Sequence, residues 1–360
     1  MVDGDQIEAF PCQVKIQVPH RISGFFQMQD PDKSPNIILP LKIGSRGGGP
    51  ALTAYGITLI RNEATIKDQM NSNTNFPEQN SDFSSINFPF AKLTANSSSS
   101  QEKCLYFRIM INQQDYSHRA VTSITVLKLM LSFLPPTARI SIIHKFDLPL
   151  GAGYGSSGAG ALGIALGLNE LFQLGLTPLE AAQYAHIAEV QNHTGLGTVA
   201  GQFIGGLALV LEPGYPFQMQ KILVPDNIYV GLASWGPIST KYILTDPSYK
   251  RLIFEKGRQA MEQMHKEWSL ENYMKVCRDF LQNTQLLEKL HLPIIANVIN
   301  ELNQATQLGA SLNQLGKSVF CFCTTEEKED VAAIMGKYHP SFGPKFVQVS
   351  EMGYAVLHSE

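Results

Sequence analysis

Apolar stretches broken by turn residues dominate the start of the chain. CQVKIQVP (12–19), NIILPLKIG (36–44) and LTAYGITLI (52–60) are rich in strand-forming residues and are separated by turn residues. LYFRIMIN (105–112) and ARISIIHKFDL (138–148) have the same character. This pattern predicts that the N-terminal part of the protein is built around a β-sheet.

Helical spacing of apolar residues replaces this pattern in the middle of the chain. YSHRAVTSITVLKLMLSFL (116–134) is amphipathic and ends before two prolines, and a further helix is expected over 158–173. Another begins at TPLE (177–180), where Thr177 can be the N-cap, a proline takes the first helical position and Glu180 closes a capping box. The region therefore reads as strand followed by consecutive helices.

The pattern changes again near residue 222. The stretch TGLGTVAGQFIGGLALVLEP (194–213) first returns the chain to a strand. Strands are then expected near 222–233 and 317–324, two or three helices across 248–308, and a last strand near GYAVLH (353–358). This order predicts an α+β second half.

Asparagine, serine and glutamine are concentrated in one segment, 67–103. Such a composition cannot bury enough apolar surface to order itself, so we expect a mostly flexible loop insertion. Outside this insertion, the change of pattern predicts two domains, 1–215 and 216–360.

Composition narrows the class of protein. The chain has 360 residues, of which 44% are hydrophobic and 16% charged, which is enough apolar material for real cores. The formal net charge of −3 provides no basic excess for a nucleic-acid partner. The N-terminus has no signal-peptide pattern, and no run approaches the roughly 20 apolar residues of a membrane span. We expect a soluble, cytoplasmic protein with no membrane partner.

The five cysteines are scattered and odd in number, which is typical of reduced thiols in an intracellular protein. Cys321 and Cys323 share one face of a predicted strand, but no second ligand pair follows them. We interpret both as packing residues rather than as half of a metal site.

The stretch DLPLGAGYGSSGAGALGIALGLNEL (147–171) is the strongest chemical pattern in the sequence. Gly153, Gly155 and Gly158 match the G-x-G-x-x-G of dinucleotide-binding folds, but the following helix leads to another helix instead of a second parallel strand. A P-loop is also excluded, because GASLNQLGKS (309–318) has six residues between its glycines where the motif needs four.

A phosphate cradle remains. Backbone N–H groups of a glycine turn at a helix N-terminus attract an anion, and the hydroxyls of Ser156 and Ser157 could add ligands for phosphate or Mg²⁺. The alternative is a closely packed helix whose glycines only admit a neighbour. The residues alone leave both interpretations open.

PLGAGYGSSGAGAL (149–162) resembles the P-x-x-x-G-L-G-S-S-A-A motif of the GHMP kinases, with Tyr154 where leucine is commoner. Four further segments are similar to archaeal pantoate kinases within that superfamily: VPHRISGFF (18–26), GSRGGGPAL (44–52), AHIAEVQNHTGLG (185–197) and GPISTK (236–241). The resemblance implies an α+β, two-domain GHMP-kinase fold. Its N-terminal, ATP-binding domain would be a ribosomal-protein-like β/α domain, and its C-terminal domain would be ferredoxin-like.

By this resemblance the protein would use ATP and Mg²⁺. The ATP phosphates would lie on the glycine turn, at Gly151, Gly153, Gly155, Ser156, Ser157, Gly158 and Ala159. Ser157 and Glu189 would bind the metal, and an oxygen ligand such as Glu189 suits Mg²⁺. His186 and His193 flank Glu189 at helical spacing, but Mg²⁺ disfavours imidazole, so we assign them to structure.

The acceptor implied by the resemblance is pantoate, a small hydroxy acid. Arg46 is the candidate cation for its carboxylate, because a guanidinium fork fits a carboxylate in a bidentate manner. The other substrate-binding candidates come from segments that the resemblance places beside the acceptor: His20, Ser23, Gly24, Ser45, Ser239 and Thr240. A homodimer is expected from the family alone.

One departure from the family pattern concerns catalysis. Where the relatives read G-L-G-D, this chain ends the motif with Thr198. The aspartate is the expected base, and threonine cannot be a base at neutral pH. Three expectations follow: ATP-dependent phosphorylation of (R)-pantoate to 4-phosphopantoate in coenzyme A biosynthesis without a carboxylate base, action on another small hydroxy acid, or a catalytically weak or inactive paralogue that acts as a nucleotide-binding or regulatory subunit.

Overall fold

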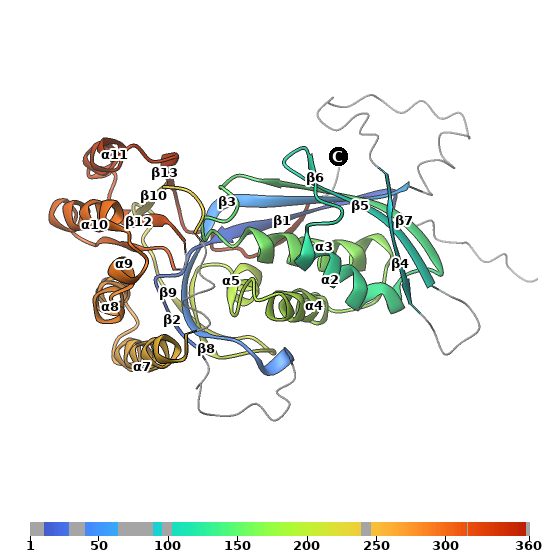
Figure 1. Cartoon of the computed structure of the whole chain (residues 1–360), viewed down its shortest axis with the longest axis horizontal. Coiled ribbons are helices and arrows are strands. Elements are labelled where there is room, and N and C mark those ends of the chain that lie inside the picture. Colours follow the sequence, from blue (N-terminus) through green and yellow to red (C-terminus); the bar gives the residue numbers. More distant parts are fainter. Residues whose placement is uncertain are drawn as a thin grey trace, which may run out of the picture.

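The structure is a computed structural model that describes residues 11–28, 40–63, 89–95, 103–238, 246–314 and 316–357. Its described helices and strands form two sheets with helices packed on each, which confirms the predicted α+β class (Figure 1). The first sheet carries most of the N-terminal half, and the second sheet lies in the C-terminal half.

The first sheet has ten strands, with the order β14-β1-β3-β7-β5-β4 along its main path. Neighbouring strands are antiparallel except β5 and β7, which are parallel. Its strands are β1 (Gln13–Arg21), β2 (Phe25–Gln27), β3 (Arg46–Asn62), β4 (Ala91–Ala95), β5 (Lys103–Ile111), β6 (Gln114–Asp115), β7 (Thr137–Phe146), β8 (Leu207–Glu212), β9 (Gln218–Ile222) and β14 (Ala355–Leu357). The long strand β3 pairs with β2 and β8 at its start and with β7 at its end, so it links the whole sheet.

Helices cover one face of this sheet (Figure 1). They are α2 (Val121–Met130), α3 (Ser156–Leu171), α4 (Pro178–Gln191) and α5 (Thr198–Ile204), with short 3-10 turns η1 (Pro40–Lys42) and η2 (Leu131–Phe133). Helix α3 packs directly on β1 and β3, and its small residues allow this: a Cβ on Gly163 would lie 2.2 Å from Thr58 Oγ1. The close-packing explanation therefore holds for this later part of the glycine-rich helix.

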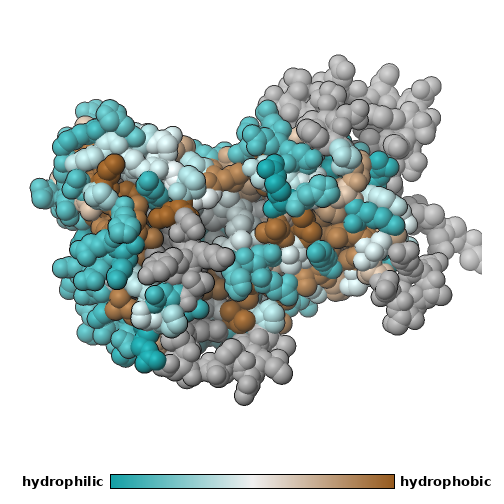
Figure 2. Space-filling view, in the orientation of Figure 1, coloured by the Kyte–Doolittle hydropathy of each residue, from teal (hydrophilic) through white to brown (hydrophobic). Residues whose placement is uncertain are grey.

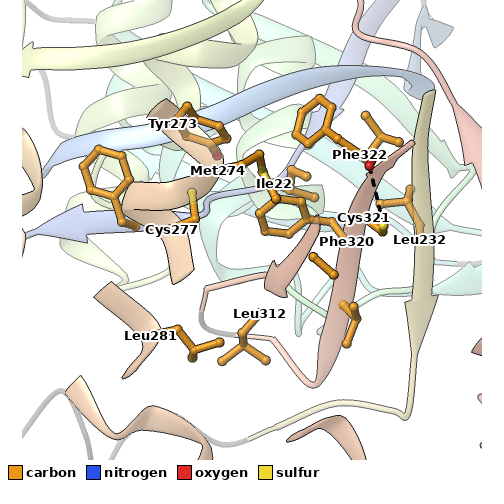
Figure 3. Close-up of a cluster of buried hydrophobic side chains, with 14 of the residues drawn as sticks. Ile22, Leu232, Tyr273, Met274, Cys277, Leu281, Leu312, Phe320, Cys321 and Phe322 are labelled. Atoms are coloured by element: carbon orange, nitrogen blue, oxygen red, sulfur yellow. Dashed lines mark hydrogen bonds between the residues drawn. The ribbon is translucent and has the colours of Figure 1, made fainter. Parts of the chain in front are cut away.

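The second sheet has the order β11-β12-β10-β13 and is antiparallel throughout. Its strands are β10 (Tyr229–Ser234), β11 (Gly309–Leu312), β12 (Ser318–Cys323) and β13 (Phe342–Val347), and its helices are α7 (Pro247–Met264), α8 (Leu270–Thr284), α9 (Leu286–Lys289), α10 (Pro293–Ala305) and α11 (Lys328–Lys337). Phe320 and Phe322 of β12 face Tyr273 and Cys277 of α8 in the core beneath them (Figure 3). Cys321 and Cys323 are fully buried in this core, as expected for packing residues.

Several local predictions are confirmed. Thr177 accepts a 3.2 Å hydrogen bond from the N–H of Glu180, and the Glu180 carboxylate accepts one of 2.7 Å from the N–H of Thr177, so the capping box is complete. GASLNQLGKS (309–318), which was excluded as a P-loop, begins with strand β11 and ends at the first residue of β12.

Other local predictions are wrong. The stretch 194–213 does return the chain to a strand, β8, but its first part forms helix α5, which was not expected because the helix contains a glycine and β-branched residues. In NIILPLKIG the described part, 40–44, holds the turn η1 and no strand. Within the predicted insertion the described residues 91–95 form β4, which pairs with β5 and is thereby stabilised as a strand. Helix α11 and strand β13 were not expected.

Among the described residues no helix combines the length and the apolarity that a bilayer crossing needs. Figure 2 shows one face of the molecule, on which apolar residues form separate patches among hydrophilic ones.

Candidate active site

A cavity of about 530 Å³ lies where the start of α3 meets the loop after β1, the start of β3 and the turn before α5. The glycine turn contributes Gly151, Gly153 and Gly155, followed by Ser156 and Ser157. Segments that are distant in sequence thus converge on the stretch that sequence analysis singled out. Residues Ala120–Ser123, at the start of α2, also line the cavity.

The glycine turn has a backbone that other residues rarely adopt. Gly151, Gly153 and Gly155 have φ values of 73°, 86° and 71°, and Gly155 is the N-cap of α3. A Cβ on Gly155 would also lie 2.8 Å from Thr198 Cγ2. Both the conformation and the close approach therefore require glycine, and the first N–H groups of a 16-residue helix are left facing the cavity.

The turn is held from both sheets. The N–H of Arg21 in β1 donates a 3.1 Å hydrogen bond to the carbonyl of Tyr154. Ser318 of β12 donates one of 2.7 Å to the carbonyl of Ala152, and the Tyr154 ring is buried. These contacts fix the position of the cradle before any ligand arrives.

Two predicted phosphate-binding residues lie behind the cradle and not at the cavity wall. Gly158 and Ala159 are buried in the first turn of α3. A Cβ on Gly158 would lie 2.5 Å from Gln202 Oε1, so this glycine serves the packing of α3 against α5. Ser156 is at the wall, and its buried hydroxyl has no hydrogen-bond partner among the described residues.

Glu189 of α4 is not part of the cavity wall and lies next to it, behind Gly158 of α3 and Gly195. Its side chain is 1% exposed, and Thr194 donates a 2.6 Å hydrogen bond to its Oε1. Its Oε2 has no partner among the described residues, and a Cβ on Gly195 would lie 2.0 Å from it. Burial raises the pKa of Glu189, an effect that the nearby hydroxyls of Thr194 and Ser157 oppose.

This arrangement fits a divalent metal ion that takes oxygen ligands. A buried carboxylate oxygen without a partner lies near the Ser157 hydroxyl and behind the bare backbone of Gly195. No group of three His, Cys, Asp or Glu residues within the described part of the chain could hold a metal by itself. A hard cation here would need further oxygens from its ligand, which is how Mg²⁺ is usually bound with phosphates.

The cavity is also lined by residues predicted to act on the acceptor. Ser23, Ser45 and Thr198 are at its wall. The N–H of Ser45 donates a 2.9 Å hydrogen bond to the carbonyl of Leu196, so the start of β3 and the turn before α5 are held together. A Cβ on Gly197 would lie 3.0 Å from Ser45 Oγ, which keeps this junction tight.

Three other predicted acceptor residues lie away from the cavity wall. His20 is buried and its Nδ1 donates a 2.9 Å hydrogen bond to the carbonyl of Tyr154. Gly24 faces α8, where a Cβ would lie 2.2 Å from Cys277 Sγ. Arg46 donates from Nε to the carbonyl of Leu211 at 2.6 Å and from Nη1 to Gln27 Oε1 at 3.4 Å. Ser239 and Thr240 lie outside the described residues.

Sequence reasoning missed three residues at this site. Thr122 and Thr194 line the cavity and their hydroxyls are 3.0 Å apart, which extends the hydrogen bonding of Glu189 to α2. Arg21 is at the wall and is buried. An arginine inside an otherwise apolar strand, as in VPHRISGFF, is the signal that could have found it.

The described residues that line the cavity include no aspartate or glutamate. Thr198 stands at the cavity wall. The cavity therefore offers hydroxyls, backbone N–H groups and a guanidinium to a ligand, and its carboxylate, Glu189, lies just behind the wall.

Comparisons with known proteins agree with this geometry. Residues 120–206 match the family model of the GHMP kinases N terminal domain. The chain is 34% identical over 194 residues to a pantoate kinase of Methanocaldococcus jannaschii, covering 54% of this chain and 68% of that protein. It is 35% identical over 201 residues to a pantoate kinase of Thermococcus kodakarensis, covering 54% of this chain and 63% of that protein.

One solved structure shares the fold over nearly the whole length. It is described as a phosphotransferase related to the CoA biosynthesis pathway, with a TM-score of 0.72, 24% identity, and coverage of 96% of this chain and 98% of that one.

Proposed function

The chain belongs to the pantoate kinase family of the GHMP kinases, and on this premise we propose that it transfers the γ-phosphoryl group of ATP to (R)-pantoate. The products are ADP and 4-phosphopantoate, in the route to coenzyme A. The observation that carries the proposal is one cavity whose wall holds the start of α3, with the unpartnered oxygen of Glu189 just behind that wall at Gly195.

The triphosphate would lie on the glycine turn, where fixed N–H groups and the positive end of α3 neutralise its charge. Apolar side chains of Ile111, Tyr116, Val121 and Phe146 line the adjoining part of the cavity and suit a nucleobase. Phosphoryl transfer depends on such positioning and charge neutralisation more than on covalent chemistry.

Glu189 and Ser157 would hold Mg²⁺, which when bound neutralises charge on the phosphate oxygens. Thr194 fixes the Glu189 carboxylate through Oε1 and so leaves Oε2 for the metal. Glycine at position 195 keeps the space beside that oxygen clear, since a Cβ there would lie 2.0 Å from it.

The acceptor hydroxyl would lie beside Thr198, between the cradle and the wall formed by Ser23 and Ser45. Transfer through a loose transition state lets the proton leave the hydroxyl late, so a carboxylate base is not obligatory. A general base typically contributes about 10²–10⁴-fold, so we expect slow turnover. The competing proposal, a weak or inactive paralogue, is favoured by the same feature, the absence of an acidic residue among the described lining residues.

An ADP-release assay with pantoate, homoserine, mevalonate or no acceptor tests the function. ADP formed with pantoate alone supports the proposal. ADP formed with another hydroxy acid instead identifies a different acceptor. Nucleotide binding without turnover on any acceptor establishes the inactive paralogue.

We further propose the boundary at 215/216, a cytoplasmic location and a homodimer. Limited proteolysis, cell fractionation and light scattering of the purified protein test these three in turn.

A further inference from the structure

Arg21, at the end of β1, is a cation enclosed by protein. Its side chain is 3% exposed in total, although it contributes to the cavity wall. Nε donates to the carbonyl of Gly49 at 3.2 Å, Nη1 to that of Gly197 at 2.8 Å and Nη2 to that of Ala208 at 2.8 Å. A guanidinium has five N–H donors, so these three bonds leave two of them unassigned.

Two glycines enclose the guanidinium. A Cβ on Gly48 would lie 2.1 Å from Nη2, and a Cβ on Gly201 would lie 2.0 Å from Nε. The slot therefore exists only because neither residue has a side chain. Such a slot fixes the plane of the guanidinium and so the direction of its remaining donors.

No carboxylate of the described residues pairs with this charge. The partners of Arg21 are all backbone carbonyls, and the ion pairs of the described residues lie elsewhere, at Arg108, Arg258 and Lys337. Burial accordingly lowers the pKa of Arg21 to about 10, which leaves it charged at neutral pH. A buried charge without a counter-ion is costly, and an anion that enters the cavity would remove that cost.

The other arginines near the cavity do not meet these conditions. Arg119 is an exposed residue at the wall, with its guanidinium carbon 4.6 Å from the centre of the Tyr116 ring, on the side assigned above to the nucleobase. Arg46, the candidate from the sequence, donates to Leu211 and Gln27 and is not part of the wall.

We propose that Arg21 binds the carboxylate of the acceptor, an inference that rests on the proposed function because it names the cation for that same substrate. Nη1 of Arg21 bonds to Gly197, the residue before Thr198, so the anchored carboxylate lies beside the turn that faces the acceptor hydroxyl. Ser23 and Ser45 at the same wall supply hydroxyls for the rest of a short hydroxy acid. Arg21 thereby selects anionic acceptors over neutral ones.

The test compares pantoate with pantoamide, in which a neutral amide replaces the carboxylate. Both kcat/KM and the affinity, measured by calorimetry in the presence of ADP, are determined for wild type, Arg21→Gln, Arg21→Lys and Arg46→Gln. We expect Arg21→Gln to lower kcat/KM for pantoate by roughly 100-fold or more, since a buried charged partner is lost, and to leave pantoamide nearly unaffected. Arg21→Lys keeps the charge and should keep part of the preference, whereas Arg46→Gln should keep all of it.

If Arg21 had only a structural role, Arg21→Gln would lower kcat/KM equally for pantoate and for pantoamide. That result overturns the inference. The inference is also overturned if Arg46→Gln removes the preference for pantoate over pantoamide, or if wild type binds both compounds equally. These two measurements remain possible even if the Arg21 variants do not fold. Wild type that binds pantoate through Arg21 without turning it over would contradict the proposed function and keep the inference. If Arg21→Gln turns over pantoate and still prefers it to pantoamide as wild type does, the result supports the proposed function and overturns the inference.

Discussion

Thr194 donates a 2.6 Å hydrogen bond to one oxygen of Glu189, while the other oxygen of that buried carboxylate has no partner among the described residues. The hydroxyl of Thr194 lies 3.0 Å from that of Thr122, so α2, α4 and the turn before α5 meet at this point. One half of the carboxylate is thus oriented by the protein and the other half is left for a ligand.

Glu189→Gln is expected to lower kcat roughly 100-fold or more, since a metal ion contributes several kcal/mol to catalysis. The Mg²⁺ concentration for half-maximal rate should rise. Because burial raises the pKa of Glu189, a neutral side chain should not lower the melting temperature of the metal-free protein. Glu180→Gln on the same helix is the control, since glutamine also completes a capping box. Equal losses in both variants would contradict the metal-binding role.

Gly155→Ala is expected to weaken ATP binding at least tenfold, because its Cβ would meet Thr198 Cγ2 at 2.8 Å at the mouth of α3. Gly175→Ala is a matched control: the φ values are 71° and 73°, but nothing lies within 4 Å of a Cβ on Gly175. Both variants should lose about 1–2 kcal/mol of stability from the left-handed conformation. Equal nucleotide affinities in calorimetric titrations would show that the turn does not hold ATP.

Thr198→Asp is expected to raise kcat, with an upper range of about 10²–10⁴-fold if the new carboxylate takes the acceptor proton. Thr198→Val keeps the methyl group that packs at Gly155 and should change kcat little, because a threonine hydroxyl is not a base at neutral pH. Steady-state rates of ADP release measure both. An unchanged rate for an active Thr198→Asp enzyme would refute the placement of this residue beside the acceptor hydroxyl.

Two buried histidines predict a loss of stability in mild acid. Burial lowers the pKa of His20 and of His144 to about 4 from the ordinary 6.5. Between these values the unfolded chain binds more protons than the folded one, so the free energy of unfolding falls as pH falls. The slope is up to about 1.4 kcal/mol per pH unit for each histidine.

Urea unfolding across this pH range measures that slope. His144→Gln removes one titrating group while keeping a polar side chain beside Thr58, whose hydroxyl is 2.9 Å from His144 Nδ1. It should remove about half of the two-histidine slope. A variant with the wild-type slope would show that His144 is not the group responsible.

Local signals predicted local structure well. The capping box of Thr177 and Glu180 depends on residues three apart, and the glycine turn depends on adjacent residues, so both are readable from the sequence. The position of β4 depends on pairing with β5, a tertiary contact that overrides its polar surroundings.

The choice between the two arginines could not be made from the sequence. Arg46 lies in a glycine-rich segment that suggests exposure to a ligand, whereas the more apolar segment of Arg21 suggests burial and does not say whether the charge meets a ligand or main-chain carbonyls. Their roles are decided by Gly48 and Gly201, which form the slot around Arg21 from distant parts of the chain. Similarly, position 24 needs a glycine because Cys277 of α8 packs against it, and not because a substrate binds there.

The return of β14 to the edge of the first sheet has a practical consequence. Lys15, Ile16 and Gln17 of β1 pair with residues 355–357, far beyond the proposed domain boundary at 215/216. A fragment ending at that boundary would leave this side of β1 with open main-chain donors and acceptors, which invite association with other chains. Expression of the N-terminal half alone should therefore yield aggregates, and a soluble product should require both the 218–222 strand, which pairs with β8, and the 355–357 strand.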